Sequence, residues 1–148
     1  MKSAREVCQG SGTPHFHRRG GELWCEDVPL ARLCERFGTP LYVYSEAAML
    51  ERVAAVRAAF ADQAVVCYAV KANSNLSVLR TMHRGGAGFD VVSGGELARL
   101  QAAGLPTDRV VFAGVAKQRA EIEAAAGAGI LFFNVESPHE LPLLAAVG

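Results

Sequence analysis

Apolar runs alternate with segments of helical periodicity along most of this chain. Four runs rich in β-branched and aromatic residues begin at positions 65, 88, 109 and 130, at intervals of about 22 residues. After each run, apolar residues recur every three or four positions, which is the spacing of an amphipathic helix. The pattern therefore predicts four strand–helix units, with strands over 65–70, 88–92, 109–113 and 130–135.

Turn and capping residues support the limits of these units. The pair Gly85-Gly86 is expected to end the first helix, and Gly104 the second. The last helix opens with Ser137 as N-cap and Glu140 three residues later, which predicts a capping box.

Strand–helix units joined by short loops predict a parallel sheet with helices outside it. A doubly wound sheet calls for a G-x-G-x-x-G turn after a strand, and the sequence has none. A (β/α)8 barrel has eight units in about 250 residues. Four units therefore predict an α/β fold that is the first half of a (β/α)8 TIM-type barrel, occupying residues 39–148, with the chain cut off about halfway round.

The first 38 residues differ from the rest and mix Gly, Pro, His and charged residues with little period. Short strands are predicted around 15–18 and 22–25, followed by a helix over about 30–37. A strand is predicted over 39–45, where Ser45 is a good N-cap for the next helix. We expect 1–38 to be a separate N-terminal segment.

The composition limits the function classes. The 148 residues are 51% hydrophobic and carry 15 basic and 15 acidic side chains, so the protein is globular, and no net charge favours nucleic acid or an anionic membrane. No run approaches the ~18 apolar residues of a membrane span, and no signal peptide is evident. Four cysteines without a C-x-x-C pair predict reduced thiols in a cytoplasmic protein, although a metal site at Cys25 and Cys34 stays open as an alternative.

Lys71 ends the first predicted strand, which is an unusual place for a lysine. Side chains alternate along a strand, so Lys71 shares a face with Ala69, while bulky Tyr68 and Val70 face the helices. In a barrel, chemistry is located at the carboxyl ends of the strands. A part-buried lysine there is a nucleophilic amine suited to Schiff-base chemistry, with pyridoxal phosphate (PLP) as a leading cofactor.

Each candidate also has a structural interpretation. Lys71 is equally well explained as a solvated residue just past a strand. Asp90 is expected on the inward face of the second strand, where it could simply pair with a lysine. Glu96 closes the pattern Ser93-Gly-Gly-Glu96, which has the form of a capping box.

The segments YAVKANSN, GFDVVSGGEL and FAGVAKQRAEIEAAAGAGILFFNVES, in this order, resemble the fold-type III PLP-dependent decarboxylases. The family fold is an eight-stranded barrel with a second, β-rich domain, so the resemblance assigns residues 1–38 to that domain. It implies that Lys71 attaches PLP and that Asp90 and Glu96 lie near the cofactor. It also implies that Ala69 lies on the cofactor face and that Ser93 belongs to the same loop.

The upstream segment GGELWCEDVPLARLCERFGTPLYVYS is most similar to family members that decarboxylate meso-2,6-diaminopimelate to L-lysine and CO2. The resemblance implies this reaction in a homodimer, with no metal, and an inactive fragment where half of the site is missing. Ornithine or arginine decarboxylation, a non-catalytic PLP-binding barrel and a cofactor-free barrel remain alternatives. Alanine racemases share the lysine but match the later motifs poorly.

Overall fold

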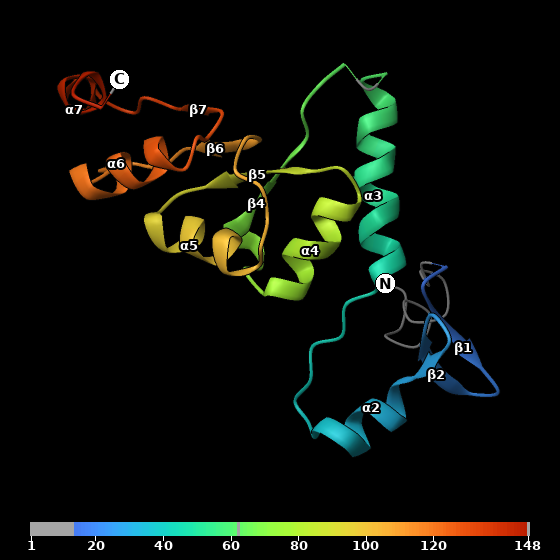
Figure 1. The fold of residues 1–148 in the computed structure, drawn as a ribbon. Helices are drawn as coiled ribbons and strands as arrows, with labels where there is room; N and C mark the ends of the chain where they lie inside the picture. The colour runs from blue at the N-terminus through green and yellow to red at the C-terminus, as the bar shows by residue number, and fades with distance from the viewer. Residues whose placement is uncertain (1–13, 62, 148) are drawn as a thin grey trace, which may run out of the picture. The chain divides into compact units, whose positions relative to one another are not determined.

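A computed structural model describes residues 14–61 and 63–147 of the chain. These residues form two compact units, which divide between Glu51 and Arg52 (Figure 1). Helix α3 (Glu46–Ala59) runs across the division.

The first unit contains a small antiparallel sheet. Its strands are β1 (Phe16–Arg19), β2 (Glu22–Cys25) and β3 (Val28–Pro29), and helix α2 (Leu30–Phe37) follows directly. Gly20 and Gly21, with φ of +60° and +87°, form the two-residue turn between β1 and β2, a conformation that glycine adopts without steric cost. The two strands and the helix predicted in this segment are confirmed.

The strand predicted over residues 39–45 is wrong. Residues 41–45 have no regular secondary structure, and Tyr42 is 86% exposed. The alternation of LYVY resembles a strand, but a strand forms only where a neighbour accepts its hydrogen bonds, and no described strand pairs with this segment. Ser45 does cap α3 as predicted, because its Oγ accepts the N–H of Ala48 at 3.0 Å.

The second unit is built on a parallel sheet. Its strands are β4 (Cys67–Ala69), β5 (Gly88–Val91), β6 (Val110–Phe112) and β7 (Phe132–Phe133). The helices between and after them are η1 (Val70–Ala72), α4 (Leu76–Arg84), α5 (Gly94–Ala102), α6 (Arg119–Gly127), η2 (Pro138–Glu140) and α7 (Leu141–Ala145). All four predicted strand–helix units are present, each strand starting within two residues of its predicted position.

The order of the strands separates the two architectures considered above. The sheet runs β4-β5-β6-β7, so each strand pairs with the next one along the chain. A doubly wound sheet would contain a point where the order reverses, and no reversal occurs among the described strands. The consecutive order is that of a (β/α)8 barrel, so the α/β class and the barrel arrangement are confirmed.

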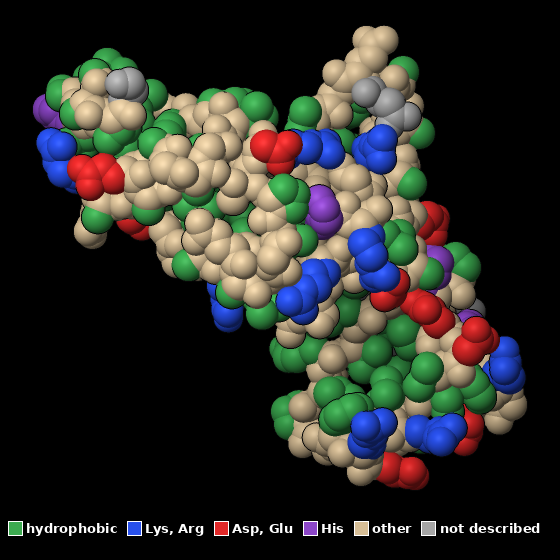
Figure 2. Space-filling model, viewed as in Figure 1, with side chains coloured by type: hydrophobic (Ala, Val, Ile, Leu, Met, Phe, Trp, Pro, Cys, Tyr) green, Lys and Arg blue, Asp and Glu red, His purple; other side chains and the backbone are tan. Residues whose placement is uncertain are grey.

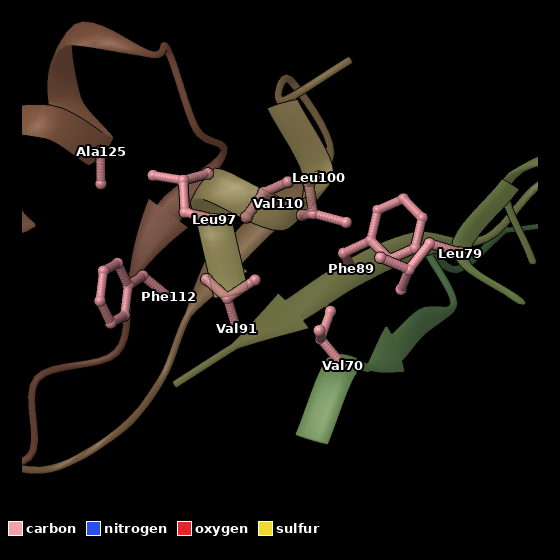
Figure 3. Packing of buried hydrophobic residues seen from close by; sticks show 9 residues of the cluster. All are labelled: Val70, Leu79, Phe89, Val91, Leu97, Leu100, Val110, Phe112 and Ala125. Carbon is pink, nitrogen blue, oxygen red and sulfur yellow. The ribbon is translucent and has the colours of Figure 1, made fainter. Parts of the chain in front are cut away.

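The core lies between the sheet and its helices (Figure 3). Phe89 and Val91 of β5, which are almost fully buried, pack against Leu79 of α4 and Leu97 and Leu100 of α5. The remaining members of the cluster come from η1, β6 and α6, and they are Val70, Val110, Phe112 and Ala125. The prediction that Phe89 and Val91 face the helices is therefore confirmed.

The opposite face of the sheet carries a row of four paired residues. Ala69 of β4 pairs with Asp90 of β5, Asp90 with Val111 of β6, and Val111 with Phe132 of β7. Because side chains alternate along each strand, this row faces away from the core described above. Asp90 is thus on the face opposite the helices, next to Ala69.

Basic side chains are dispersed on one face of the second unit. On the face of residues 52–148 seen in Figure 2, Lys and Arg side chains lie in several separate places. Among the described residues, no helix has the length and apolar character needed to span a bilayer.

Candidate functional site

Lys71 lies just beyond the carboxyl end of β4, within the single turn η1. Two hydrogen bonds stabilise the backbone around this turn. Tyr68 donates its hydroxyl to the carbonyl of Asn73, and the Asn73 side chain accepts the N–H of Asn75. Asn75 in turn caps α4. Val70 is completely buried and anchors the turn, while Lys71 is exposed. The Lys71 amine has no hydrogen bond or ion pair with any described residue.

Asp90 lies on the neighbouring strand, at the register position of Ala69, two residues before Lys71. Its Oδ1 atom is buried and has no hydrogen-bond partner among the described residues. A buried acceptor without a donor costs free energy, so such atoms are rare and call for a partner. Asp90 therefore has one carboxylate oxygen free for a group that these residues do not supply.

Cys67 lies on the same face of β4 as Ala69 and is half-buried. Burial raises the pKa of the Cys67 thiol, and the negative charge of Asp90 raises it further, while Arg109 opposes the shift. The thiol is therefore kept protonated beside Asp90, and we assign it no chemical role. The three described cysteines, Cys25, Cys34 and Cys67, are free, and Cys8 lies outside the described residues.

Ser93 and Glu96 form the loop after β5. Ser93 Oγ accepts the N–H of Glu96 at 3.3 Å, and Glu96 Oε2 accepts the N–H of Val92 at 2.8 Å. Both side chains thus hold the start of α5, which supports a structural role, but the capping box differs from the predicted one because Glu96 accepts the N–H of Val92 rather than that of Ser93. A direct cofactor contact by Ser93 or Glu96 stays a prediction.

Glu121, at the start of α6, is a residue that the sequence analysis did not select. Its Oε1 accepts the N–H of Gly94 at 2.7 Å, and its Oε2 accepts the N–H of Gln118 at 3.0 Å. These two hydrogen bonds hold the pKa of Glu121 below its ordinary value. The spacing Gln118-x-x-Glu121 is a sequence signal for the second bond, but no local pattern indicates the first.

Lys117 and Glu140 form a buried ion pair that the sequence analysis also missed. The Lys117 ammonium donates to the carbonyls of Gly114 and Asn134, and to Glu140 Oε2 at 3.0 Å. The predicted capping box requires Glu140 to accept the backbone N–H of Ser137. This prediction is wrong, because the carboxylate accepts the N–H of Glu136 instead. Its position is instead set by Lys117, which the local pattern could not indicate.

Among residues 14–61 and 63–147, no three His, Cys, Asp or Glu side chains are grouped so that they could hold a metal ion. The carboxyl ends of β4 and β5 offer an exposed amine, that of Lys71, and a carboxylate with one unpartnered oxygen, that of Asp90.

Comparison with known proteins agrees with this site. Residues 46–148 match the family model described as pyridoxal-dependent decarboxylase, pyridoxal binding domain. A diaminopimelate decarboxylase from Neisseria meningitidis is 53% identical over 120 residues, which is 80% of this chain and 30% of that protein. The chain belongs to the pyridoxal-dependent decarboxylases, and it spans about 30% of the length of the curated relatives it matches.

Solved structures give the same result. A diaminopimelate decarboxylase from M. jannaschii, in complex with L-lysine, is 34% identical with a TM-score of 0.82, over 92% of this chain and 33% of that one. A lysine/ornithine decarboxylase from Vibrio vulnificus, complexed with putrescine, is 27% identical with a TM-score of 0.73, over 79% and 32% of the two chains. The predicted family and its cofactor, PLP, are confirmed.

The described residues fit this cofactor. PLP carries an aldehyde that reacts with an amine, and Lys71 offers an exposed amine without a partner at the carboxyl end of β4. Asp90 offers a buried carboxylate oxygen that lacks a donor on the adjacent strand. The exposed lysine alone needs no ligand, but the buried Asp90 Oδ1 would be left unexplained in a barrel that binds none.

Proposed function

We propose that the full-length protein catalyses the PLP-dependent decarboxylation of meso-2,6-diaminopimelate to L-lysine and CO2. The observation that supports the chemistry is the pairing of β4 with β5. Ala69 of β4 pairs with Asp90, whose Oδ1 has no partner among the described residues, and Lys71 follows two residues after Ala69. The choice of substrate is supported by the 53% identity to a diaminopimelate decarboxylase from Neisseria meningitidis. Among the solved structures, the identity is 34% to a diaminopimelate decarboxylase, against 27% to a lysine/ornithine decarboxylase.

In this proposal Lys71 holds PLP through its amine. Its place after a fully buried Val70 limits how far the backbone can move, so the amine stays at the carboxyl end of β4. When it is not bonded to the cofactor, Lys71 Nζ would be available to hold and return a proton at the reacting carbon. PLP, when bound, supplies the electron sink that stabilises the negative charge left by departing CO2.

The remaining site residues have supporting roles in the proposal. Asp90 presents Oδ1 toward the cofactor and accepts a hydrogen bond or balances positive charge there. Ala69 has only a methyl group on the same face, which leaves room beside Asp90. Ser93 and Glu96 keep the loop after β5 in place, and Glu96 is the weakest candidate for direct contact, since Val92 already occupies one of its oxygens.

The first test is CO2 release by the full-length protein with PLP. meso-Diaminopimelate, L-ornithine and L-arginine are assayed in parallel, and we expect turnover of diaminopimelate alone. Turnover of ornithine or arginine would keep the chemistry and replace the substrate. Bound PLP without turnover would instead support a non-catalytic PLP-binding protein, and no PLP absorbance would support a cofactor-free barrel.

A second test locates the cofactor lysine. After treatment with PLP and borohydride, peptide mapping is expected to find the stable adduct on Lys71 and not on Lys117, which is buried and fully hydrogen-bonded. Lys71→Ala is expected to remove the adduct. An adduct of undiminished yield in Lys71→Ala would contradict the assignment.

We further propose that residues 1–38 belong to a β-rich second domain, that the full-length protein is a homodimer and that it works in the cytoplasm. The three-stranded sheet of β1, β2 and β3 supports the first point. The family resemblance supports the dimer, and sedimentation of the full-length protein at several concentrations tests it. Sedimentation as a monomer at all concentrations would contradict the dimer.

A further inference from the structure

The loop after β5 is held by a side chain from the neighbouring strand–helix unit. Gly94, the first residue of α5, donates its N–H to Glu121 Oε1, which belongs to α6. At 2.7 Å this is a short, charge-assisted hydrogen bond. The loop it holds begins with Ser93, three residues after Asp90.

The contact depends on a glycine at position 94. A Cβ atom built on Gly94 would lie 3.1 Å from Glu121 Cγ and 3.3 Å from its Oε1. These separations are tighter than ordinary van der Waals contacts, so a larger residue would push the carboxylate back. Glycine at this position therefore lets the backbone and the carboxylate approach each other closely.

Three glutamates use one oxygen in the same way. Glu96, Glu121 and Glu140 each accept a backbone N–H from a residue three or four positions earlier, which is Val92, Gln118 and Glu136 respectively. Glu121 uses its other oxygen to bond the backbone of the preceding unit, at Gly94. Its side chain thus fixes two loops at once, one of which contains Ser93 and Glu96.

We propose that Glu121 is a positioning residue of the candidate site, whose carboxylate holds the loop of Ser93–Glu96 in the place where the cofactor needs it, next to Asp90. Glu121 does not touch the cofactor in this proposal. It acts through Gly94, and the proposal rests on PLP binding at Lys71 and Asp90 as argued above.

The test compares Glu121→Gln with Glu123→Gln in the full-length protein. Glutamine has the size of glutamate but only one oxygen, so Glu121→Gln cannot accept from both Gly94 and Gln118. Glu123 lies on the same helix, is exposed and pairs only loosely with Arg119, at 3.8 Å. PLP affinity is measured by absorbance titration, and amide hydrogen exchange is followed in the peptide covering residues 92–97 without PLP.

We expect Glu121→Gln to raise the PLP dissociation constant about tenfold, as for loss of a hydrogen bond to a charged group, and to speed exchange in residues 92–97. Glu123→Gln is expected to change neither. If Glu121→Gln does not fold, Gly94→Ala disturbs the same contact from the other side and is expected to weaken PLP binding as well.

Three outcomes overturn the inference. Faster exchange in residues 92–97 with unchanged PLP affinity would mean that Glu121 holds the loop but that the loop does not position the cofactor. Unchanged exchange in Glu121→Gln would mean that the carboxylate does not hold the loop. If the unmutated protein binds no PLP, the proposed function is wrong and the inference fails with it. The PLP titration of the unmutated protein alone distinguishes this outcome from the other two.

Discussion

The ammonium of Lys117 lies 3.0 Å from a carboxylate oxygen of Glu140, and their side chains are only 1% and 6% exposed. All three N–H groups of this ammonium have partners, because it also donates to the carbonyls of Gly114, after β6, and Asn134, after β7. One lysine therefore joins the loops that follow two adjacent strands. The hydrogen bonds it makes also lower the pKa of Glu140, together with the N–H of Glu136, which contributes most.

Lys117→Met is expected to destabilise the full-length protein by about 3 kcal/mol, because it leaves a buried carboxylate without its counter-ion. Lys117→Met combined with Glu140→Leu is expected to recover much of that loss. Arg119→Met is the control, since it breaks an exposed pair with Glu123 and should cost less than about 0.5 kcal/mol. Urea unfolding measures all three variants, and equal midpoints for Lys117→Met and Arg119→Met would contradict the buried pair.

Two glycine substitutions should act in opposite directions. A Cβ atom on Gly88 would lie 2.3 Å from the carbonyl oxygen of Arg109, so Gly88→Ala must push β5 and β6 apart, at a cost of about 1–3 kcal/mol. Gly127, in α6, has open space around it, so Gly127→Ala is expected to stabilise by about 0.5–1 kcal/mol. Thermal unfolding of both variants checks the signs, and a stabilising Gly88→Ala would refute the close pairing.

Cys67 reports on the charge of Asp90. That charge raises the pKa of the thiol, after the larger effect of burial, so Asp90→Asn is expected to lower the pKa and to speed alkylation of Cys67 severalfold at pH 8. Iodoacetamide labelling followed by peptide mapping gives the rate, with Cys34 as the internal control. An unchanged Cys67 rate would mean that the two side chains do not share a face of the sheet.

The stability contributed by Glu121 should depend on pH. Its pKa in the folded protein lies below the ordinary value of 4.5, because Gly94 and Gln118 donate to the carboxylate. Such a group adds stability above about pH 4.5 and loses it as the pH falls through the folded-state pKa. We expect the urea midpoints of the parent and Glu121→Gln to differ at pH 7 and to converge toward pH 3. A constant difference would contradict the lowered pKa.

Local patterns predicted the sheet well because its strands obey a simple rule. Positions facing the helices must be bulky, so Phe89 and Val91 identify the core face, and Asp90 between them must lie on the other face. The same rule put Ala69 in phase with Asp90, and the register of β4 with β5 agrees, whereas Lys71 lies in the turn η1, where strand alternation no longer applies. Strand and helix periods, together with capping residues, therefore suffice to locate the candidate site.

Other features depend on partners that are distant in sequence. Lys117 is surrounded by polar and small residues, so the local pattern is typical of a solvated lysine, yet two carbonyls and Glu140 enclose it. Glu121 is likewise defined by Gly94, in the preceding unit. The segment over 41–45 alternates like a strand, but alternation does not supply the neighbouring strand that it would need.

The consecutive order of β4, β5, β6 and β7 has a consequence for how the protein is made. Every strand pairs only with units next to it in sequence, so each new strand–helix unit can dock on the one before it as the chain leaves the ribosome. Glu121 and Glu140 each reach back to the preceding unit, so their bonds join the third unit to the second and the fourth to the third. Biosynthesis of this sheet can therefore proceed vectorially, with β4 and β5 paired before β6 and β7 emerge.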